Sequence, residues 1–152
     1  MHVRSFLIFI ALMFHSTTVD NSSEVIEIKV QKSKTSALPC YQKDIEKFSK
    51  QYEICPALLL AVIMVESNCR IEAVGMSGEL GLGQIRQEFW RDFLSQQGID
   101  DIRGVEATAS VLSYHVKKWG MEKGVERYNG KGKKSVEYRQ KIMKKRSEIL
   151  SL

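Results

Sequence analysis

The chain has 152 residues, of which 23 are Lys or Arg and 18 are Asp or Glu, so its formal net charge is +5. This length leaves room for one domain. Beyond the first residues no stretch is apolar and long enough to cross a bilayer as a helix, which excludes a multi-spanning membrane protein.

Residues 1–18 have the layout of a secretory signal peptide. Arg4 precedes nine consecutive apolar residues, 6–14, and small polar residues follow at 16–18. Nine apolar residues are too few to span a bilayer. We expect cleavage near Thr18 and an exported protein, periplasmic or secreted to the cell wall, without stable membrane insertion; an uncleaved anchor is the alternative. Loss of Arg4 leaves 22 basic and 18 acidic residues, a net charge of +4.

Residues 19–36 are mostly polar and predict a flexible N-terminal tail. Ile26, Ile28 and Val30 alternate with charged residues, which allows at most one short strand. The compact domain is expected to cover residues 37–152.

The first two predicted helices differ in character. Ile45, Phe48 and Tyr52 form one apolar stripe, which predicts an amphipathic helix over 42–51. Pro56 suits the first turn of a second helix, which extends to about Asn68 and is apolar on most sides. A helix of that kind must be central, with other helices around it.

The rest of the chain predicts further helices separated by turns. Residues 75–83 contain four glycines and must be irregular. Apolar residues at helical spacing predict helices ending near Gly98 and covering 105–119, and Tyr128-Asn129-Gly130 interrupts the pattern. Ser135 is a candidate cap of a final helix. No sustained strand pattern follows residue 36, so the fold class is all-α, with about five to seven helices.

Three cysteines in an exported chain predict one disulfide and one unpaired thiol. Cys55 and Cys69 lie at opposite ends of the second predicted helix, about 20 Å apart, too far to pair. If the preceding helix packs antiparallel, Cys40 returns close to Cys69, which makes this the preferred pair. Zinc is not expected, because His115 is the sole histidine after residue 18 and the cysteine spacings are long. We expect His115 to be structural.

The segment 131–146 carries eight Lys or Arg residues and one acidic residue, Glu137. Such a run is typical of a solvated helix face, and it also attracts polyanions. Export argues against nucleic acid as the partner and favours an anionic polymer of the cell wall.

Three motifs occur in a specific order. They are Glu66-Ser67, then Ala73-Val74 with Gly78 and Gly81-Leu82-Gly83-Gln84-Ile85, then Tyr128-Asn129. This order resembles the lysozyme-like lytic transglycosylases of the soluble-transglycosylase (SLT) type, whose pattern is Glu-Ser, Gly-Ala-x-Gly-Leu-Met-Gln and Ala-Tyr-Asn. The interval from Glu66 to Gln84 matches without a gap, and the resemblance covers about residues 44–145.

The resemblance implies a role for each matched residue. Glu66 is the single catalytic acid and base, and Ser67 follows it in the motif as a substrate-side residue. Gln84 and the backbone around Gly81 line the cleft. The later residues complete the site: Tyr128 and Asn129 hold the acid and the N-acetyl sugar, and Tyr138, in a Tyr-x-x-Lys-Ile segment, closes it.

The sequence departs from the family pattern at several positions. Gly83 replaces a Met, which we expect to open the cleft or loosen the turn, and Gly104 replaces an Asn, which removes one substrate contact. The other departures are Cys69, Arg70, Ile71, Gly75 and Glu79. None of them removes the acid.

The position of Glu66 suits a proton donor. It ends an apolar run that begins at Pro56, and burial against hydrocarbon raises the pKa of a carboxyl group. The negative end of the helix dipole acts in the same direction. Most glycosidases use two carboxylates, but the substrate's acetamido group can replace the second. The resemblance implies cleavage of the bond between N-acetylmuramic acid and N-acetylglucosamine in peptidoglycan, with a 1,6-anhydromuramoyl product and no cofactor.

Alternatives remain for individual residues. Arg70 lies four residues after Glu66 and would lower its pKa by pairing with it. Glu79 would supply a second carboxylate for hydrolysis, as in goose-type lysozymes, if it faces Glu66. Tyr128-Asn129 would be a simple polar turn, and Tyr138 a core residue. The aromatic residues Phe89, Trp90 and Phe93 are expected in the core rather than as sugar platforms.

Two other classes of function compete with a transglycosylase. One is a non-catalytic glycan-binding module of the same fold, and the other is a cationic membrane-active protein. Small size and a signal peptide resemble the family members that open the wall for secretion or conjugation machines. We expect a monomer that is recruited by such machinery through residues 19–36 or the basic C-terminal helix.

Overall fold

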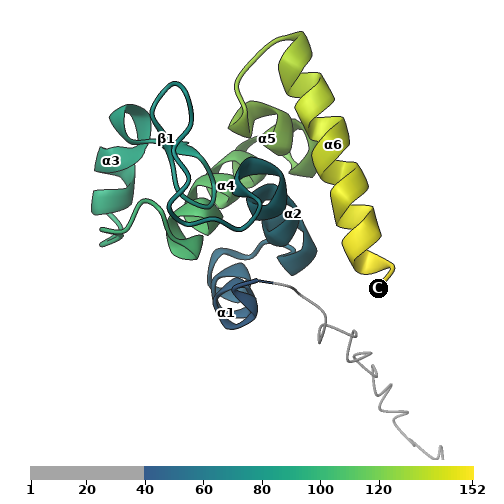
Figure 1. Cartoon of the computed structure of the whole chain (residues 1–152), viewed down its shortest axis with the longest axis horizontal. Helices are drawn as coiled ribbons and strands as arrows, with labels where there is room; N and C mark the ends of the chain where they lie inside the picture. The colour runs from purple at the N-terminus through teal and green to yellow at the C-terminus, as the bar shows by residue number, and fades with distance from the viewer. Residues whose placement is uncertain (1–39) are drawn as a thin grey trace, which may run out of the picture. The chain divides into compact units, whose positions relative to one another are not determined.

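The computed structural model describes residues 40–152, a helical domain that also contains one short hairpin (Figure 1). The predicted signal peptide (1–18), tail (19–36) and first three residues of the predicted domain lie outside the described residues. In chain order the elements are α1 (Gln42–Tyr52), α2 (Pro56–Ser67), β1 (Glu79–Leu80), β2 (Ile85–Arg86), α3 (Gln87–Ser95), α4 (Val105–Trp119), α5 (Met121–Tyr128) and α6 (Lys133–Leu150).

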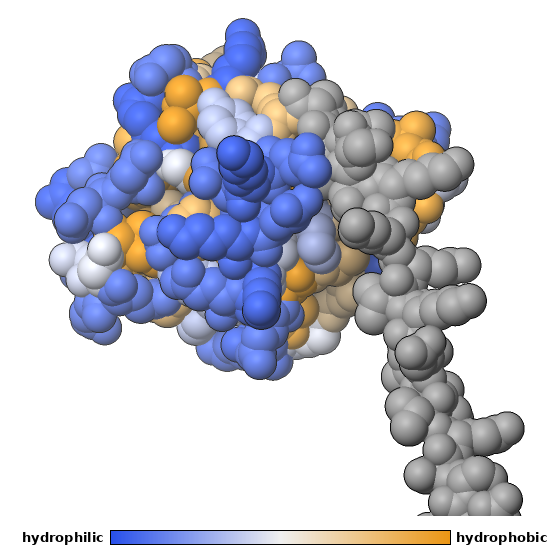
Figure 2. Space-filling view, turned by 90° about the horizontal axis from the view of Figure 1, so that it is seen from below, coloured by the Kyte–Doolittle hydropathy of each residue, from blue (hydrophilic) through white to orange (hydrophobic). Residues whose placement is uncertain are grey.

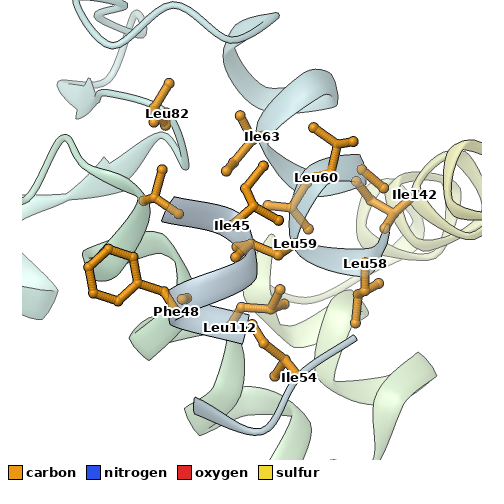
Figure 3. Close-up of a cluster of buried hydrophobic side chains, with 14 of the residues drawn as sticks. Ile45, Phe48, Ile54, Leu58, Leu59, Leu60, Ile63, Leu82, Leu112 and Ile142 are labelled. Carbon is orange, nitrogen blue, oxygen red and sulfur yellow. The ribbon is translucent and has the colours of Figure 1, made fainter. Parts of the chain in front are cut away.

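Helix α2 forms the centre of the fold. Residues 57–63 are all buried, and the side chains of Leu59, Leu60 and Ile63 are completely inaccessible. Apolar residues surround the whole circumference of this helix, so other elements must cover every side of it. Helix α1 contributes Ile45 and Phe48, α4 contributes Leu112, α6 contributes Ile142, and the glycine-rich turn contributes Leu82 (Figure 3). The predicted central apolar helix is therefore confirmed.

A second, smaller cluster lies between α3 and α4. Its buried members are Ile85, Leu94, Ile99, Ala107 and Val111. Each buried aliphatic side chain contributes about 1.5–3 kcal/mol relative to an exposed one. This cluster fixes α3 and the end of β2 against α4, and so it determines where one wall of the cleft lies.

The predicted all-α class is confirmed, and the predicted bounds agree closely for three helices. The helix predicted over 105–119 has those limits, and the first two differ by one residue at their ends. Residues 75–83 are mostly irregular, as expected, but β1 and β2 pair antiparallel, with Glu79 opposite Arg86. Strands of two residues are too short to produce a recognisable alternation. The third helix ends at Ser95, three residues before Gly98.

Two details at the C-terminal side differ from the prediction. Helix α6 begins at Lys133 with Gly132 as its N-cap, so Ser135 is not the cap. The hydroxyl of Ser135 instead donates a hydrogen bond to the carbonyl of Gly132, at 2.9 Å, and is buried.

Helix α5 was not predicted, because its centre contains a glycine and it offers few apolar residues. Glycine lowers helix propensity by about 1 kcal/mol relative to alanine. In the fold, however, a Cβ at Gly124 would lie 2.7 Å from the Cα of Val116, so glycine allows α5 to pack directly on α4. Val125 is completely buried at this contact. Tertiary packing therefore stabilises a helix that its local sequence disfavours.

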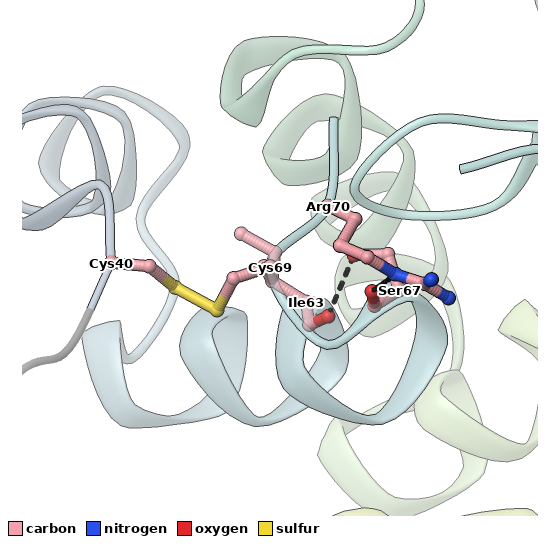
Figure 4. The surroundings of a disulfide bond; sticks show 5 residues. All are labelled: Cys40, Ile63, Ser67, Cys69 and Arg70. Carbon is pink, nitrogen blue, oxygen red and sulfur yellow. Dashed lines mark hydrogen bonds between the residues drawn. A yellow bond between two sulfur atoms is a disulfide. The ribbon is translucent and has the colours of Figure 1, made fainter. Parts of the chain in front are cut away.

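Cys40 and Cys69 form a disulfide that joins the segment before α1 to the segment after α2 (Figure 4). Their Cα atoms are 6.3 Å apart, whereas Cys55 is unpaired. Asn68 and Cys69 both have left-handed backbone conformations, with φ of 50° and 62°. Because such a conformation is costly for a residue other than glycine, the surrounding structure must hold it. The disulfide thus fixes the turn directly after Glu66.

The surface of the domain is mainly polar on the face shown in Figure 2, with apolar residues exposed in small groups. Among residues 40–152, none of the helices combines the length and apolar character needed to span a membrane.

We predict that the double substitution Cys40→Ser/Cys69→Ser lowers the free energy of unfolding by about 3 kcal/mol, because the bond closes a loop between residues 29 apart in sequence. Urea denaturation of oxidised protein measures the change. Cys55→Ser is the matched control and should have a much smaller effect. Equal stability of the double variant and the wild type would contradict a formed disulfide.

Candidate active site

A pocket of about 520 Å³ lies beside the end of α2. It is lined by residues from five parts of the chain: Glu66 from α2, Glu79 and Gln84 to Arg86 from the hairpin, Phe89 and Trp90 from α3, Val111 and His115 from α4, and Arg127 to Gly130 from α5 and the following loop. This volume falls in the range of small-ligand sites. The pocket brings together four of the predicted site residues: Glu66, Gln84, Tyr128 and Asn129.

Glu66 is largely buried and opens to this pocket. Its Oε1 accepts a hydrogen bond from the hydroxyl of Tyr138, at 2.6 Å. Burial raises the pKa of Glu66 to about 7, against the opposing effects of the Tyr138 hydrogen bond and the positive charge of Lys141; the negative charge of Glu79 adds to the increase. Desolvation therefore outweighs the groups that stabilise the carboxylate. At mildly acidic pH, Glu66 holds a proton that it can donate.

The glycine-rich turn is held by backbone contacts. Gly81 has φ of 70°, and a Cβ on it would lie 2.3 Å from the Cα of Arg103, so no other residue fits. The N–H of Leu82 donates to the carbonyl of Arg103, at 2.9 Å. Gly81 itself is buried and does not line the pocket. Its contribution is to shape the turn that carries Gln84.

Gln84 lies between the turn and the pocket. Its Nε2 donates to the carbonyls of Gly81, at 2.9 Å, and of Ala73, at 3.3 Å. Both donated bonds go to the backbone, which leaves the side-chain oxygen as the group that can face a ligand. A Cβ on Gly75 would lie 2.8 Å from that oxygen, so glycine at this position preserves the space around it.

Gly83 allows close approach of Tyr128 and Thr108. The hydroxyl of Tyr128 donates to the carbonyl of Gly83, at 2.8 Å. A Cβ on Gly83 would lie 2.5 Å from that hydroxyl and 2.6 Å from the Oγ1 of Thr108. These two residues thus occupy the space that a side chain at Gly83 would need, and the expectation of an opened cleft or a loosened turn stays a prediction. Tyr128 is anchored here, so it is not a residue of a simple polar turn.

Ser67 does not line the pocket, although a substrate-side position was expected for it, and Arg70 does not pair with Glu66. Ser67 is buried, and its hydroxyl donates to the carbonyl of Ile63, at 3.0 Å (Figure 4). Arg70 donates from Nε to the carbonyl of Ser67, at 3.1 Å. No ion pair between Arg70 and Glu66 occurs in the described part of the chain. Arg70 therefore does not neutralise the acid, and Ser67 supports the helix end.

Aromatic side chains form one wall of the pocket. Phe89 is 65% exposed, contrary to its expected place in the core, whereas Phe93 packs in the second cluster and Trp90 is half-buried. His115 also lines the pocket and stacks on Trp119. Burial lowers the pKa of His115 to about 4, so its imidazole is neutral. Its Nδ1 is buried without a hydrogen-bond partner among the described residues, and the structural role expected for His115 stays a prediction.

Two arginines of the pocket were missed by the sequence analysis. Arg86 directly follows the glycine-rich motif, and Arg127 directly precedes Tyr128. Their proximity to the motifs is the signal that could have identified them. Neither position is distinctive by residue type, since basic residues are common throughout this chain.

Within residues 40–152, His, Cys, Asp and Glu do not form a group of three that could hold a metal ion.

The transglycosylase SLT domain family matches residues 43–150, most of the chain. The chain belongs to this family. A comparison with curated proteins gave no significant match. Members of the SLT family are lytic transglycosylases that act on peptidoglycan, so the family supports a lytic transglycosylase-like function and a location outside the cytoplasm, where peptidoglycan lies.

We predict that Glu66→Gln stabilises this SLT domain at neutral pH. Below pH about 4.5 the carboxyl is protonated in both states and contributes nothing, and as pH rises to about 7 the unfolded chain ionises first, which costs the folded state up to about 3 kcal/mol. Urea denaturation at several pH values should show that the variant becomes more stable than the wild type as pH rises from about 4.5 to about 7. The exposed control Glu137→Gln should show no such window. A pH-independent difference for Glu66→Gln would contradict the raised pKa.

We also predict that Tyr138→Phe raises the pKa of Glu66 further, because the phenol hydrogen bond stabilises the ionised form. Carbon-13 NMR titration of the Glu66 carboxyl measures the pKa directly. Tyr114→Phe is the matched control, since Tyr114 is partly exposed on α4 and does not contact Glu66. An unchanged pKa in Tyr138→Phe would mean that the hydrogen bond does not form in solution.

Proposed function

We propose that the protein is a peptidoglycan lytic transglycosylase that cleaves the β-1,4 bond between N-acetylmuramic acid and N-acetylglucosamine and leaves a 1,6-anhydromuramoyl end. One observation carries this proposal: Glu66, the acid position of the SLT family pattern, is a desolvated carboxyl group with a pKa of about 7 that faces a pocket. A general acid is most effective when its pKa lies near the working pH.

In the first step the protonated Glu66 donates its proton to the glycosidic oxygen. The bond from this oxygen to the muramic acid C1 breaks, and the N-acetylglucosamine end leaves with the proton. The acetamido group of the muramic acid stabilises the cationic centre, as in substrate-assisted glycosidases. Tyr138 stabilises the resulting Glu66 carboxylate through its hydrogen bond.

In the second step the Glu66 carboxylate accepts the proton of the C6 hydroxyl of the same sugar. The C6 oxygen forms a bond to C1, which closes the 1,6-anhydro ring and restores the protonated acid. Water is not consumed. Gln84 and Asn129 line the pocket as hydrogen-bonding groups for the sugar amide and hydroxyls, and Tyr128 positions the turn next to them.

Hydrolysis is the second candidate reaction, because Glu79 lines the same pocket. Its Oε2 accepts a hydrogen bond from the N–H of Ser77, at 2.9 Å, which restrains it as part of the hairpin. A second carboxylate that activates water would produce a free reducing end. We favour the lytic route, because the chain follows the SLT pattern at Glu66 and Gln84.

A non-catalytic glycan-binding module is less well supported, since binding alone does not require a desolvated acid. For its cellular role, we propose local opening of the wall for a secretion or conjugation apparatus by an exported monomer. The basic face of α6 supports attraction to an anionic wall polymer. Five lysines in this region are exposed and have no ion-pair partner among the described residues: Lys131, just before the helix, and Lys133, Lys134, Lys141 and Lys144 on it.

The test is mass spectrometry of the products released from purified sacculi. We expect 1,6-anhydromuramoyl ends from the wild type, and a rate lower by about 10²–10⁴ for Glu66→Gln, the contribution of a general acid. Glu137→Gln is the control for loss of one carboxylate and should match the wild type. Hydrated reducing ends that disappear in Glu79→Gln would establish hydrolysis instead. Unchanged release by Glu66→Gln would remove the proposed mechanism.

A further inference from the structure

The pocket contains two positively charged groups for which the proposed reaction has no use. Arg127 and Arg86 line it together with Glu66 and Glu79. Proton transfer and ring closure require one carboxyl group and the substrate's own hydroxyl and acetamido groups. The two guanidinium groups therefore require another explanation.

Arg127 has unused hydrogen-bonding capacity. Its Nε is buried without a partner, and within residues 40–152 it forms no ion pair. The guanidinium lies 6.0 Å from the centre of the Trp119 ring, which restricts its position without occupying its donors. A guanidinium has five donors in a planar fork that suits a carboxylate. Leaving the buried Nε–H unmet is costly unless a ligand in the pocket accepts it.

Arg86 is the weaker of the two groups. It lies over the ring of Phe89, at 4.5 Å, and forms an ion pair with Glu88. Its Nε is also buried without a partner. Arg86 is already paired with Glu88, so it can add only a second contact to an anion in the pocket. Arg127 has no ion pair within residues 40–152 and can bind the anion directly.

The charge of the pocket changes with the protonation of Glu66. When Glu66 is protonated, the two guanidinium groups face the single carboxylate of Glu79, so the lining charge is +1. His115 is neutral and does not alter this balance. Lys141 and Glu79 act on the pKa of Glu66, whereas Arg127 is not among the charges that shift it.

We propose that Arg127, assisted by Arg86, forms a subsite for a carboxylate of the peptide stem attached to N-acetylmuramic acid. This inference rests on the proposed function, because it assumes a glycan strand in the pocket. The muramic acid carries its peptide through a lactyl group, so stem carboxylates project from the same sugar whose glycosidic bond Glu66 protonates. The subsite makes the enzyme prefer peptide-bearing strands over strands stripped of peptide.

The test is a binding measurement with the Glu66→Gln protein, which leaves the strands uncut. Isothermal titration calorimetry compares three soluble glycan fragments of equal length: with free stems, with stems whose carboxylates are converted to methylamides, and with stems removed by an amidase. We expect the free-stem fragment to bind about tenfold more tightly than the other two, as for a charge-assisted bidentate contact. Equal binding of the three fragments would overturn the subsite.

Further substitutions in the Glu66→Gln protein show which residue causes the preference for free stems. Arg127→Gln should remove the preference, and Arg127→Lys should keep part of it, because the charge remains and the fork is lost. Arg91→Gln removes the same charge from an exposed position on α3 that does not line this pocket, and should keep the full preference. Loss of preference in Arg91→Gln to the same degree would mean non-specific attraction and overturn the subsite. Circular dichroism checks that each variant is folded.

The two proposals can fail separately. Equal binding of all three fragments, while the wild type still releases anhydromuramoyl products from sacculi, removes the subsite alone. Failure of the wild type to cut sacculi, while the Glu66→Gln protein prefers free stems, removes the catalytic proposal and leaves a peptide-sensing wall-binding module. Absence of binding to any fragment, together with failure of the wild type to cut sacculi, would overturn both.

Discussion

The candidate site depends on the burial of one carboxyl group at the end of a largely apolar helix. Other elements cover α2 on most sides, and its last turn places Glu66 at the pocket. Desolvation raises its pKa, while the phenol of Tyr138 limits the increase and orients the carboxyl. The same packing that stabilises the fold therefore creates the acid. A more solvated Glu66 would be ionised, and a completely enclosed one could not reach a substrate.

The glycine-rich turn shows how a departure from a family pattern can be absorbed by neighbouring residues. Gly83 stands where the pattern has a larger side chain, and the hydroxyl of Tyr128 and the side chain of Thr108 fill that space. Tyr128 then donates to the Gly83 carbonyl and ties α5 to the turn. Residues 83, 108 and 128 are distant in sequence and form one packed unit.

The pocket combines a carboxyl group of raised pKa with positively charged side chains. Glu66, Arg86 and Arg127 all line it, and the arginines are not among the groups that shift the pKa of Glu66. A guanidinium in contact with Glu66 would lower that pKa and remove the proton donor. In our proposals, the arginines attract the substrate and Glu66 supplies the proton.

The sequence by itself determined the helical class, the central position of α2 and the place of Glu66 at its end, because these follow from local periodicity and from a motif with fixed spacing. It did not predict α5, whose Gly124 disfavours a helix until α4 lies against it. It placed Phe89 in the core and missed Arg86 and Arg127. Only the tertiary structure decided these points, because exposure, unmet hydrogen-bond donors and the pKa of Glu66 depend on which distant segments pack around a residue.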